Sequence, residues 1–240
     1  MVKAKLVSWT NEPIKTIYWA FMNMHNPIPD SLDEVDISGE ELESFMDMLC
    51  KQPHQTVFEF VNTVWKFDDV SRAFQQQLTR SRQASYSIQS LRIVDVGNFA
   101  DNHAYRLPED IEEGSTDARR FHGAMVEAQD NYRELINKGV SVQAARGVLP
   151  LNIHSPITMA INLRSLYHMS GLRFCENTQG EFKEVALQMK EEVEKKMHPI
   201  LAKPMKPLCI DIGKCLSPVP CDKYDFPKAI KMDVSRWIKG

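Results

Sequence analysis

The segment QQQLTRSRQASYSIQSLRIV, residues 75–94, sets three arginines among hydroxyl and amide side chains, at positions 80, 82 and 92. A buried core segment would not carry polar groups at this density, and a flexible linker would not contain Leu78, Tyr86 and Ile93. Arginine binds phosphate through a planar two-donor fork, and each charge-assisted hydrogen bond stabilises by roughly 1.5–3 kcal/mol. Serine hydroxyls and glutamine amides next to the arginines could bind a sugar or a base. The segment therefore favours a nucleotide over a simple inorganic anion.

Two further segments carry polar groups of the same kind. Arg146 lies in AARGVLPLN, and INLRSLYHMSGLR contains Asn162, Arg164 and Arg173. A single arginine is usually a solvated surface residue, but seven such groups near expected helix ends favour a shared anion site. By itself, His168 is more often a packed or surface histidine than a ligand contact.

The composition of the chain excludes several other functions. Its 240 residues suit one large domain, and 43% hydrophobic with 25% charged residues is ordinary for a globular protein. The formal net charge of -3 argues against general nucleic-acid binding, so any anion site must be a local cluster. The sequence contains no apolar run of the roughly 18 residues that a membrane span needs, and no signal peptide. We therefore expect a cytoplasmic protein, or one of the host cytoplasm if the chain is viral.

The cysteine pattern argues against a metal site, and the missing glycine-rich motif argues against a dinucleotide-binding fold. The number of cysteines is odd and their positions are scattered, which predicts free thiols in a reducing compartment. The last three lie six residues apart without a CxxC pair or a histidine, so no metal site is expected. There is no GxSxG, no HExxH and no glycine-rich phosphate loop. A large cofactor would therefore be held by arginine side chains rather than by backbone amides.

Hydrophobic periodicity predicts the elements that position these residues. We expect strands at 4–9, 56–67 and 91–96 and a loop at 97–116. We expect helices at 38–52, 68–80, 116–139, 141–150, 158–173 and 180–201, with Asp68 or Asp69 as the second N-cap and Gly171 ending the fifth. This mixture predicts an α+β subunit with a central, mostly antiparallel sheet flanked by helices. A single catalytic domain would span residues 1–203, and a proline-rich tail residues 204–240.

Three spaced blocks of the chain resemble the flavin-dependent thymidylate synthases. The family has an Arg-His-Arg triplet followed by xxSxxxxSxR, and its match here consists of Arg80, Ser81, Arg82, Ser85, Ser90 and Arg92. The family blocks ARxVLPLN, NxR and LR are matched at 145–152, 162–164 and 172–173. The block H-x-T-x-FE is matched by His54, Thr56, Phe58 and Glu59. The resemblance covers roughly residues 50 to 190.

The resemblance implies an activity, its cofactors and an assembly. Members of the family methylate dUMP to dTMP with methylenetetrahydrofolate as carbon donor, FAD as hydride carrier and NADPH as reductant. The expected partners are thus a small-molecule nucleotide and a folate, with no nucleic acid and no membrane. The usual assembly is a homotetramer with active sites between subunits. No cysteine is required to attack the base.

The resemblance also assigns site residues by position. The residues expected to face FAD are His54, Thr56, Arg80, Ser81, Arg82, Asn162, Leu163, Arg164 and His168. The residues expected to face dUMP are Gln77, Arg80, Gln89, Ser90, Leu91, Arg92, Arg146 and Arg173. Arg173 matches the arginine that stabilises the ionised uracil ring and is the expected catalytic residue. Chemistry agrees, because a guanidinium stays charged at any ordinary pH and can stabilise a developing anion.

The sequence departs from the family at several positions. Ser81 replaces the histidine of the triplet, Phe60 the histidine of FEH, and Ile93 an aromatic residue, while Ile88 stands where the family has glutamate or glutamine. These departures leave two alternatives open beside dUMP methylation. One is a different 5-modified pyrimidine nucleotide, such as 5-hydroxymethyl-dUMP or a dCMP product. The other is a catalytically silent nucleotide-binding protein, which Ser81 and Ile88 favour and the retained Arg173 disfavours.

Overall fold

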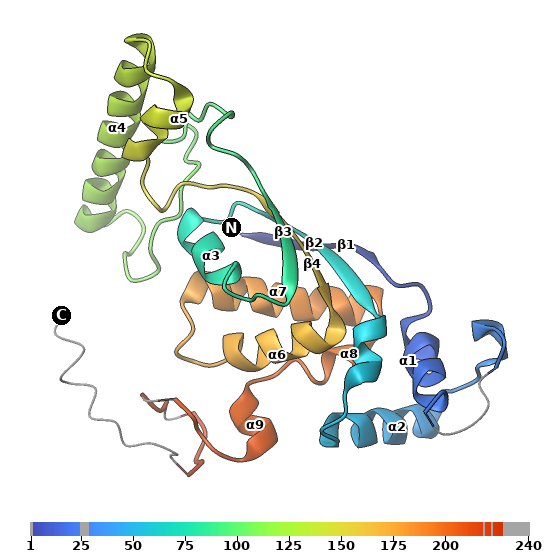
Figure 1. The fold of residues 1–240 in the computed structure, drawn as a ribbon. Helices are drawn as coiled ribbons and strands as arrows, with labels where there is room; N and C mark the ends of the chain where they lie inside the picture. The colour runs from blue at the N-terminus through green and yellow to red at the C-terminus, as the bar shows by residue number, and fades with distance from the viewer. Residues whose placement is uncertain (1, 25–28, 218, 222, 228–240) are drawn as a thin grey trace. The chain divides into compact units, whose positions relative to one another are not determined.

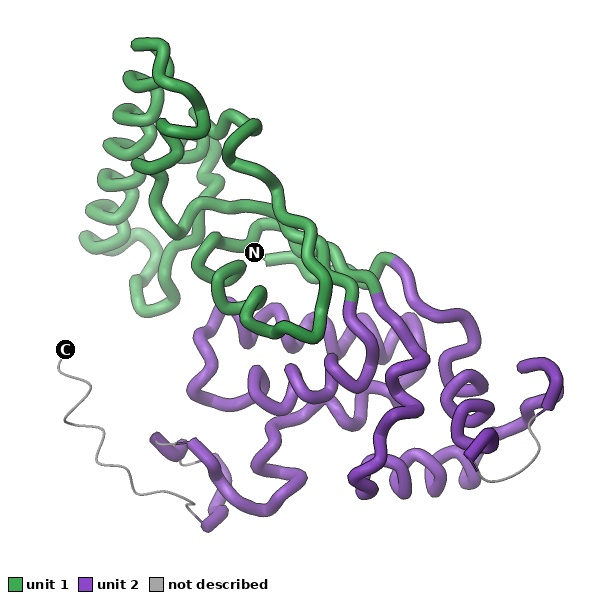
Figure 2. Tube along the Cα trace, in the orientation of Figure 1, with its two compact units in different colours: residues 1–7, 64–160 green, residues 8–63, 161–240 purple. Residues whose placement is uncertain are grey.

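The structure is a computed structural model that describes residues 2–24, 29–217, 219–221 and 223–227. The chain divides into two compact units, one of residues 1–7 and 64–160 and one of residues 8–63 and 161–240 (Figure 2). Four strands form one sheet in the order β1-β2-β4-β3: β1 is Lys3–Trp9, β2 Asn62–Asp68, β3 Ala84–Ile88 and β4 Ile157–Asn162 (Figure 1). The sheet is antiparallel and is accompanied by helices, so the predicted α+β class is confirmed.

Strands β2 and β4 show why the sheet forms. Alternate side chains of β2, including Trp65 and Phe67, are fully buried, and the residues between them are not. In β4, Ile157 and Met159 are buried in the same alternating way. A two-residue period of burial is what a strand with one covered face requires.

The first unit adds short helices and one long helix to its strands. These are α3 Arg72–Leu78, α4 Thr116–Asn137, α5 Val142–Ala145 and the 3-10 turn η3 Arg146–Val148. Serine residues are the N-caps of α4 and α5. Ser115 Oγ accepts the Ala118 N–H at 3.0 Å, and Ser141 Oγ accepts the Ala144 N–H at 3.3 Å. Gly139 follows α4 with a φ of 84°, a conformation that favours glycine at a helix end.

The second unit is mostly helical. Its elements are α1 Pro13–Met22, η1 Leu32–Glu34, α2 Gly39–Lys51, η2 Thr56–Phe60, α6 Leu163–Arg173, α7 Gly180–Lys196, α8 Pro199–Ala202 and α9 Leu208–Ile212. Helix α7 buries Phe182, Val185, Met189 and Val193, which recur every three or four residues along one face. Within the part of the chain that the structure describes, no helix has both the length and the apolar character needed to cross a membrane.

Two of the predicted strands were wrong. The segment 56–67 is not one strand, because η2 occupies its first five residues and β2 begins only at Asn62. Val57 and Phe58 are adjacent and both buried, which a strand with one covered face does not allow. Residues 91–96 form turns instead of a strand. Strand β3 was missed because its five residues are all at least partly exposed and mostly polar.

Two of the predicted helices also needed correction. Residues 158–173 are the end of β4 and then α6, and the change falls at Asn162, whose Oδ1 accepts the Ser165 N–H at 2.9 Å. Helix α6 continues through Gly171, where a Cβ would lie 3.4 Å from the Leu208 side chain, so this glycine permits close packing and does not end the helix. Helix α3 begins at Arg72 with Ser71 as its cap, because Asp69 has a φ of 56°.

Three further differences concern lengths and ends. Helix α1 was not predicted, the helix expected at 141–150 is only α5 followed by η3, and α7 ends at Lys196 before a separate α8. The proposed boundary between residues 203 and 204 stays a prediction. The described part of that tail contains the short helix α9, and residues 228–240 lie outside the described residues.

Candidate functional site

In the first unit, the turn after α3 presents three of the predicted site residues. Arg80 and Arg82 are exposed and Ser81 is half-buried. The hydroxyl oxygen of Tyr86, on β3, lies 2.8 Å from the carbonyl oxygens of both Leu78 and Ser81. Tyr86 therefore ties the backbone of the turn that carries the two arginines to the neighbouring strand, a role that the sequence did not predict.

One hydrogen bond to the residue before β4 and one within the segment hold residues 89–92. The Gln89 N–H donates to the Pro156 carbonyl at 3.2 Å, and Ser90 Oγ lies 3.4 Å from the Arg92 amide nitrogen. The Leu91 side chain belongs to the hydrophobic core of this unit and is 5% exposed, so Leu91 could meet a ligand only through its backbone.

Arg92 is held by a residue that the sequence analysis did not single out. Its Nε and Nη2 donate to Gln143 Oε1 at 2.9 and 2.6 Å. Gln143 lies three residues before Arg146, which places both near the same side of the helical turn formed by α5 and η3. Arg92 is thus tied to the short segment that also carries the predicted residue Arg146.

In the second unit, the predicted flavin residues lie on two adjoining elements, η2 and α6. His54 and Thr56 are exposed at the start of η2, and Arg164 and His168 are exposed on α6, four residues apart on one face. Glu59, on η2, accepts a hydrogen bond from Arg164 Nη1 and joins the two elements. Glu59 lies in the H-x-T-x-FE block, but its partner, 105 residues away, could not be read from that block.

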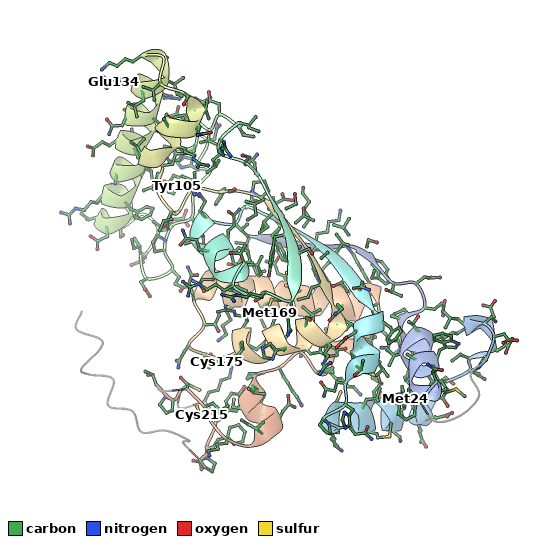
Figure 3. All side chains as sticks on the ribbon, viewed as in Figure 1. Met24, Tyr105, Glu134, Met169, Cys175 and Cys215 are labelled. Atoms are coloured by element: carbon green, nitrogen blue, oxygen red, sulfur yellow. The ribbon has the colours of Figure 1, made fainter. Side chains whose placement is uncertain are left out.

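Other members of the predicted flavin set have structural roles. Asn162 caps α6 with its side chain, and Leu163 is fully buried, so Leu163 could meet a ligand only through its backbone. Figure 3 labels Met169 on α6 and Cys175 just after the helix ends. The hydrogen bond between Asn162 Oδ1 and the Ser165 amide fixes where the exposed turn of Arg164 begins.

Arg173 is the last residue of α6 and is half-buried. Its Cζ lies 4.4 Å from the centroid of the Phe182 ring on α7, and Phe182 is 0% exposed. A guanidinium over an aromatic face at this distance is a cation–π contact.

The predicted residues therefore fall into two groups, one in each unit. The first unit holds Gln77, Arg80, Ser81, Arg82, Gln89, Ser90, Leu91, Arg92 and Arg146, and the second holds His54, Thr56, Asn162, Leu163, Arg164, His168 and Arg173. Within each unit, hydrogen bonds orient key members: the Arg80 turn and Arg92 in the first, and Arg164 in the second.

Cysteine chemistry does not contribute an obvious nucleophile. All five cysteines are free. Burial raises the pKa of the Cys50 thiol to about 11, so that it keeps its proton near neutral pH and is a poor nucleophile. Among the described residues, no group of three or more His, Cys, Asp and Glu side chains is arranged to hold a metal ion.

Comparison with known proteins decides the family. The profile of the family described as "Thymidylate synthase complementing protein" matches residues 5–200. A flavin-dependent thymidylate synthase from Pyrococcus furiosus is 32% identical, and one from Pyrococcus abyssi 30%; both alignments cover 100% of this chain and 98% of the relative. The chain belongs to the flavin-dependent thymidylate synthase family. The resemblance seen in the three sequence blocks is confirmed, and these two alignments extend through the tail beyond residue 203.

Solved structures show the same fold. A UMP/dUMP methylase from Streptomyces cacaoi, bound with 5-bromo-dUMP, superposes with a TM-score of 0.70 at 21% identity, covering 85% of this chain and 94% of its own. Thymidylate synthase X from Helicobacter pylori, with FAD and dUMP, gives a TM-score of 0.68 at 17% identity and covers 86% and 100%. At these identities the likeness supports the fold of the family.

Proposed function

We propose that this member of the flavin-dependent thymidylate synthase family methylates dUMP to dTMP, with methylenetetrahydrofolate as carbon donor and NADPH as reductant. The observation that carries the proposal is the Arg92 guanidinium of the first unit, held by Gln143 on the short segment that also carries Arg146, three residues further on. Two guanidinium groups are what a nucleotide phosphate requires. The Helicobacter pylori neighbour, whose structure holds FAD and dUMP, supports this choice of ligands.

Residues of the second unit fit FAD as the cofactor. Exposed hydrogen-bond donors and a cation gather on η2 and α6, and Glu59 already orients the Arg164 guanidinium. This donor set suits the pyrophosphate and ring oxygens of a flavin dinucleotide. The residues that would hold FAD are His54, Thr56, Arg80, Ser81, Arg82, Asn162, Arg164 and His168. FAD, when bound and reduced by NADPH, would supply the hydride that reduces the transferred carbon.

The contribution of the protein itself is positional and electrostatic. Arg92 and Arg146 would hold the phosphate of dUMP, which fixes the nucleotide. Arg173 would place a permanent positive charge beside the pyrimidine ring, where negative charge develops during carbon and hydride transfer. A guanidinium keeps that positive charge at any working pH. The proposed reaction needs no thiol to attack the ring, so it is compatible with the raised pKa of Cys50.

A product assay tests the proposal. The purified protein would be incubated with dUMP or dCMP, methylenetetrahydrofolate, FAD and NADPH, and the masses of the nucleotide products would be determined by mass spectrometry. We expect dUMP to gain one CH₂ group. No product from either nucleotide, despite bound FAD, would refute the proposal and support a silent nucleotide-binding protein.

One observation favours a second candidate, a different 5-modified pyrimidine nucleotide. Ile88, which stands where the family has glutamate or glutamine, is 42% exposed at the end of β3, immediately before Gln89 and Ser90. An exposed apolar side chain cannot make the hydrogen bonds of a carboxylate or amide, so the substrate or product could differ. A product heavier by CH₂O, or a product from dCMP, would identify this alternative in the same assay.

The replacement of histidine by Ser81 gives a prediction about FAD. A histidine ring can both stack on a flavin and hydrogen-bond to it, whereas serine offers one small hydroxyl. We expect the wild-type protein to lose part of its yellow colour during purification, and Ser81→His to bind FAD roughly tenfold more tightly, as about 1.4 kcal/mol would give. Fluorescence titration of FAD measures the affinity. Equal affinities for wild type and variant would show that Ser81 does not face the cofactor.

We also propose a homotetramer with active sites between subunits, in the cytoplasm. Large aliphatic side chains lie exposed in the first unit, including Ile93 at 81% and Leu151 at 48%, next to or near the Arg92 and Arg146 segments. Another subunit would cover them. Light scattering at micromolar concentration should give the mass of a tetramer. The mass of a monomer would contradict the proposal that active sites lie between subunits. The five free cysteines fit a reducing compartment.

A further inference from the structure

The contact between Arg173 and Phe182 has a second property beyond its distance. Phe182 is fully buried in the second unit and lies in the first turn of α7, on the same face as Val185 and Met189. The ring is therefore part of a packed core and cannot follow a moving side chain. The Arg173 guanidinium, 4.4 Å from its centroid, rests on an immobile surface.

The chain around this contact is also tied down. Thr178 Oγ1 donates to the Leu172 carbonyl at 3.2 Å, and the Phe174 N–H donates to the Ser170 carbonyl at 2.9 Å. Lys183, next to Phe182, forms an ion pair with Glu176. These bonds close the connection between the end of α6 and the start of α7, so the backbones that carry the guanidinium and the ring are held together.

We propose that Phe182 is a positioning residue, which fixes the plane of the Arg173 guanidinium for the pyrimidine ring of the substrate. The inference rests on the proposed function, because it assumes that Arg173 faces the pyrimidine. The physical basis is that a guanidinium over an aromatic ring still has N–H groups that can donate hydrogen bonds to a ligand, so both interactions can be made together. A long side chain otherwise loses rotamer entropy when it becomes fixed. The contact with the buried ring would restrict the Arg173 side chain before substrate binds, so less entropy would be lost on binding.

A different role for the same contact makes the opposite prediction. If the stack on Phe182 were a resting position that Arg173 must leave to reach the substrate, the contact would oppose binding. Removal of the ring would then tighten the nucleotide or leave its affinity unchanged. The positioning role requires that removal of the ring weaken the nucleotide and slow turnover.

Phe182→Leu tests the inference, since leucine keeps an apolar side chain and removes the aromatic face. We expect dUMP affinity and kcat/KM to fall roughly 5- to 30-fold, the range given by a partly desolvated cation–π contact. FAD content should stay at the wild-type level. Phe182→Tyr keeps the ring and should retain most of the affinity. Titration of dUMP against the absorbance of bound FAD gives the affinity on the same sample.

Phe45→Leu is the matched control. Phe45 is a buried phenylalanine of the same unit that packs edge-on against Tyr18 and Phe21, and no arginine of the described residues lies over its ring. Both leucine variants should lower the melting temperature, but only Phe182→Leu should weaken dUMP. If Phe182→Leu does not fold, Phe182→Met, which fills the volume more closely, replaces it in the comparison.

A double variant separates positioning from packing. In an Arg173→Ala background, Phe182→Leu should cause no further loss of dUMP affinity, because the guanidinium it positions is gone. Additive losses would overturn the inference, and so would a Phe182→Leu protein that binds dUMP like the wild type. A wild-type protein that neither binds nor converts dUMP would instead refute the proposed function, and this inference with it.

Discussion

Arg173→Ala is expected to lower turnover about 100- to 1000-fold while the protein keeps its fold and its FAD, because removing one preorganised donor from a developing anion typically has this effect. Arg173 lies at the end of α6 with its guanidinium over the Phe182 ring, whereas Arg164, nine residues earlier, pairs with Glu59. The two guanidinium groups thus have separate surroundings and can serve two ligands, the pyrimidine and the flavin.

Turnover and flavin content should be measured on the same preparation of the Arg173→Ala protein. Arg173→Lys is the informative companion, and we expect it to rescue poorly, since an ammonium lacks both the planar fork and the flat face that stacks on Phe182. Wild-type turnover in Arg173→Ala would refute the assignment of the pyrimidine site. If Arg173→Ala loses FAD instead of turnover, Arg173 would be assigned to the flavin and Arg164 to the pyrimidine.

Arg92→Ala should weaken dUMP by about 10- to 150-fold without changing FAD affinity. This is the loss expected when one charge-assisted hydrogen bond to a phosphate, roughly 1.5–3 kcal/mol, is removed. Gln143→Ala should cause a smaller loss of a few-fold, because Arg92 stays but the oxygen that accepts from its Nε and Nη2 is gone.

A comparison of two ligands makes the Arg92 test specific. Deoxyuridine lacks the phosphate, so its weaker binding should be the same in the wild type and in Arg92→Ala. Arg119→Ala is the charge control, as Arg119 is an arginine of the same unit whose bonds go to Gly114 and Thr116 on α4 and its preceding loop. An equal loss of dUMP and deoxyuridine in Arg92→Ala would show that Arg92 does not bind the phosphate.

The helices with a clear apolar stripe could be predicted from sequence. Residues 38–52 and 116–139 were expected to be helical and are so from Gly39 to Lys51 and from Thr116 to Asn137. In each, burial repeats every three or four residues, and a local period of this kind needs no knowledge of distant partners. The α+β class followed from the mixture of such helices with β-branched segments.

Prediction failed where the local signal was ambiguous or absent. Residues 158–173 contain apolar positions that satisfy a strand up to Asn162 and a helix after it, and only the pairing of β4 with its neighbours decides between them. Strand β3 carries mostly polar, exposed side chains, so it has no apolar alternation. Its place at the sheet edge is set by hydrogen bonds to β4, which is nearly 70 residues away in the chain.

For the site, the sequence by itself determined the residue types and their spacing: the arginines, serines and amides of the three family blocks. Tertiary structure decided which groups hold them. Gln143 orients Arg92 across 51 residues of chain, and Glu59 orients Arg164 across 105. Phe182 lies on a different helix from the Arg173 it contacts. Local chain forces extend over only a few residues, so partners of this kind are chosen when the hydrophobic faces of distant elements pack together.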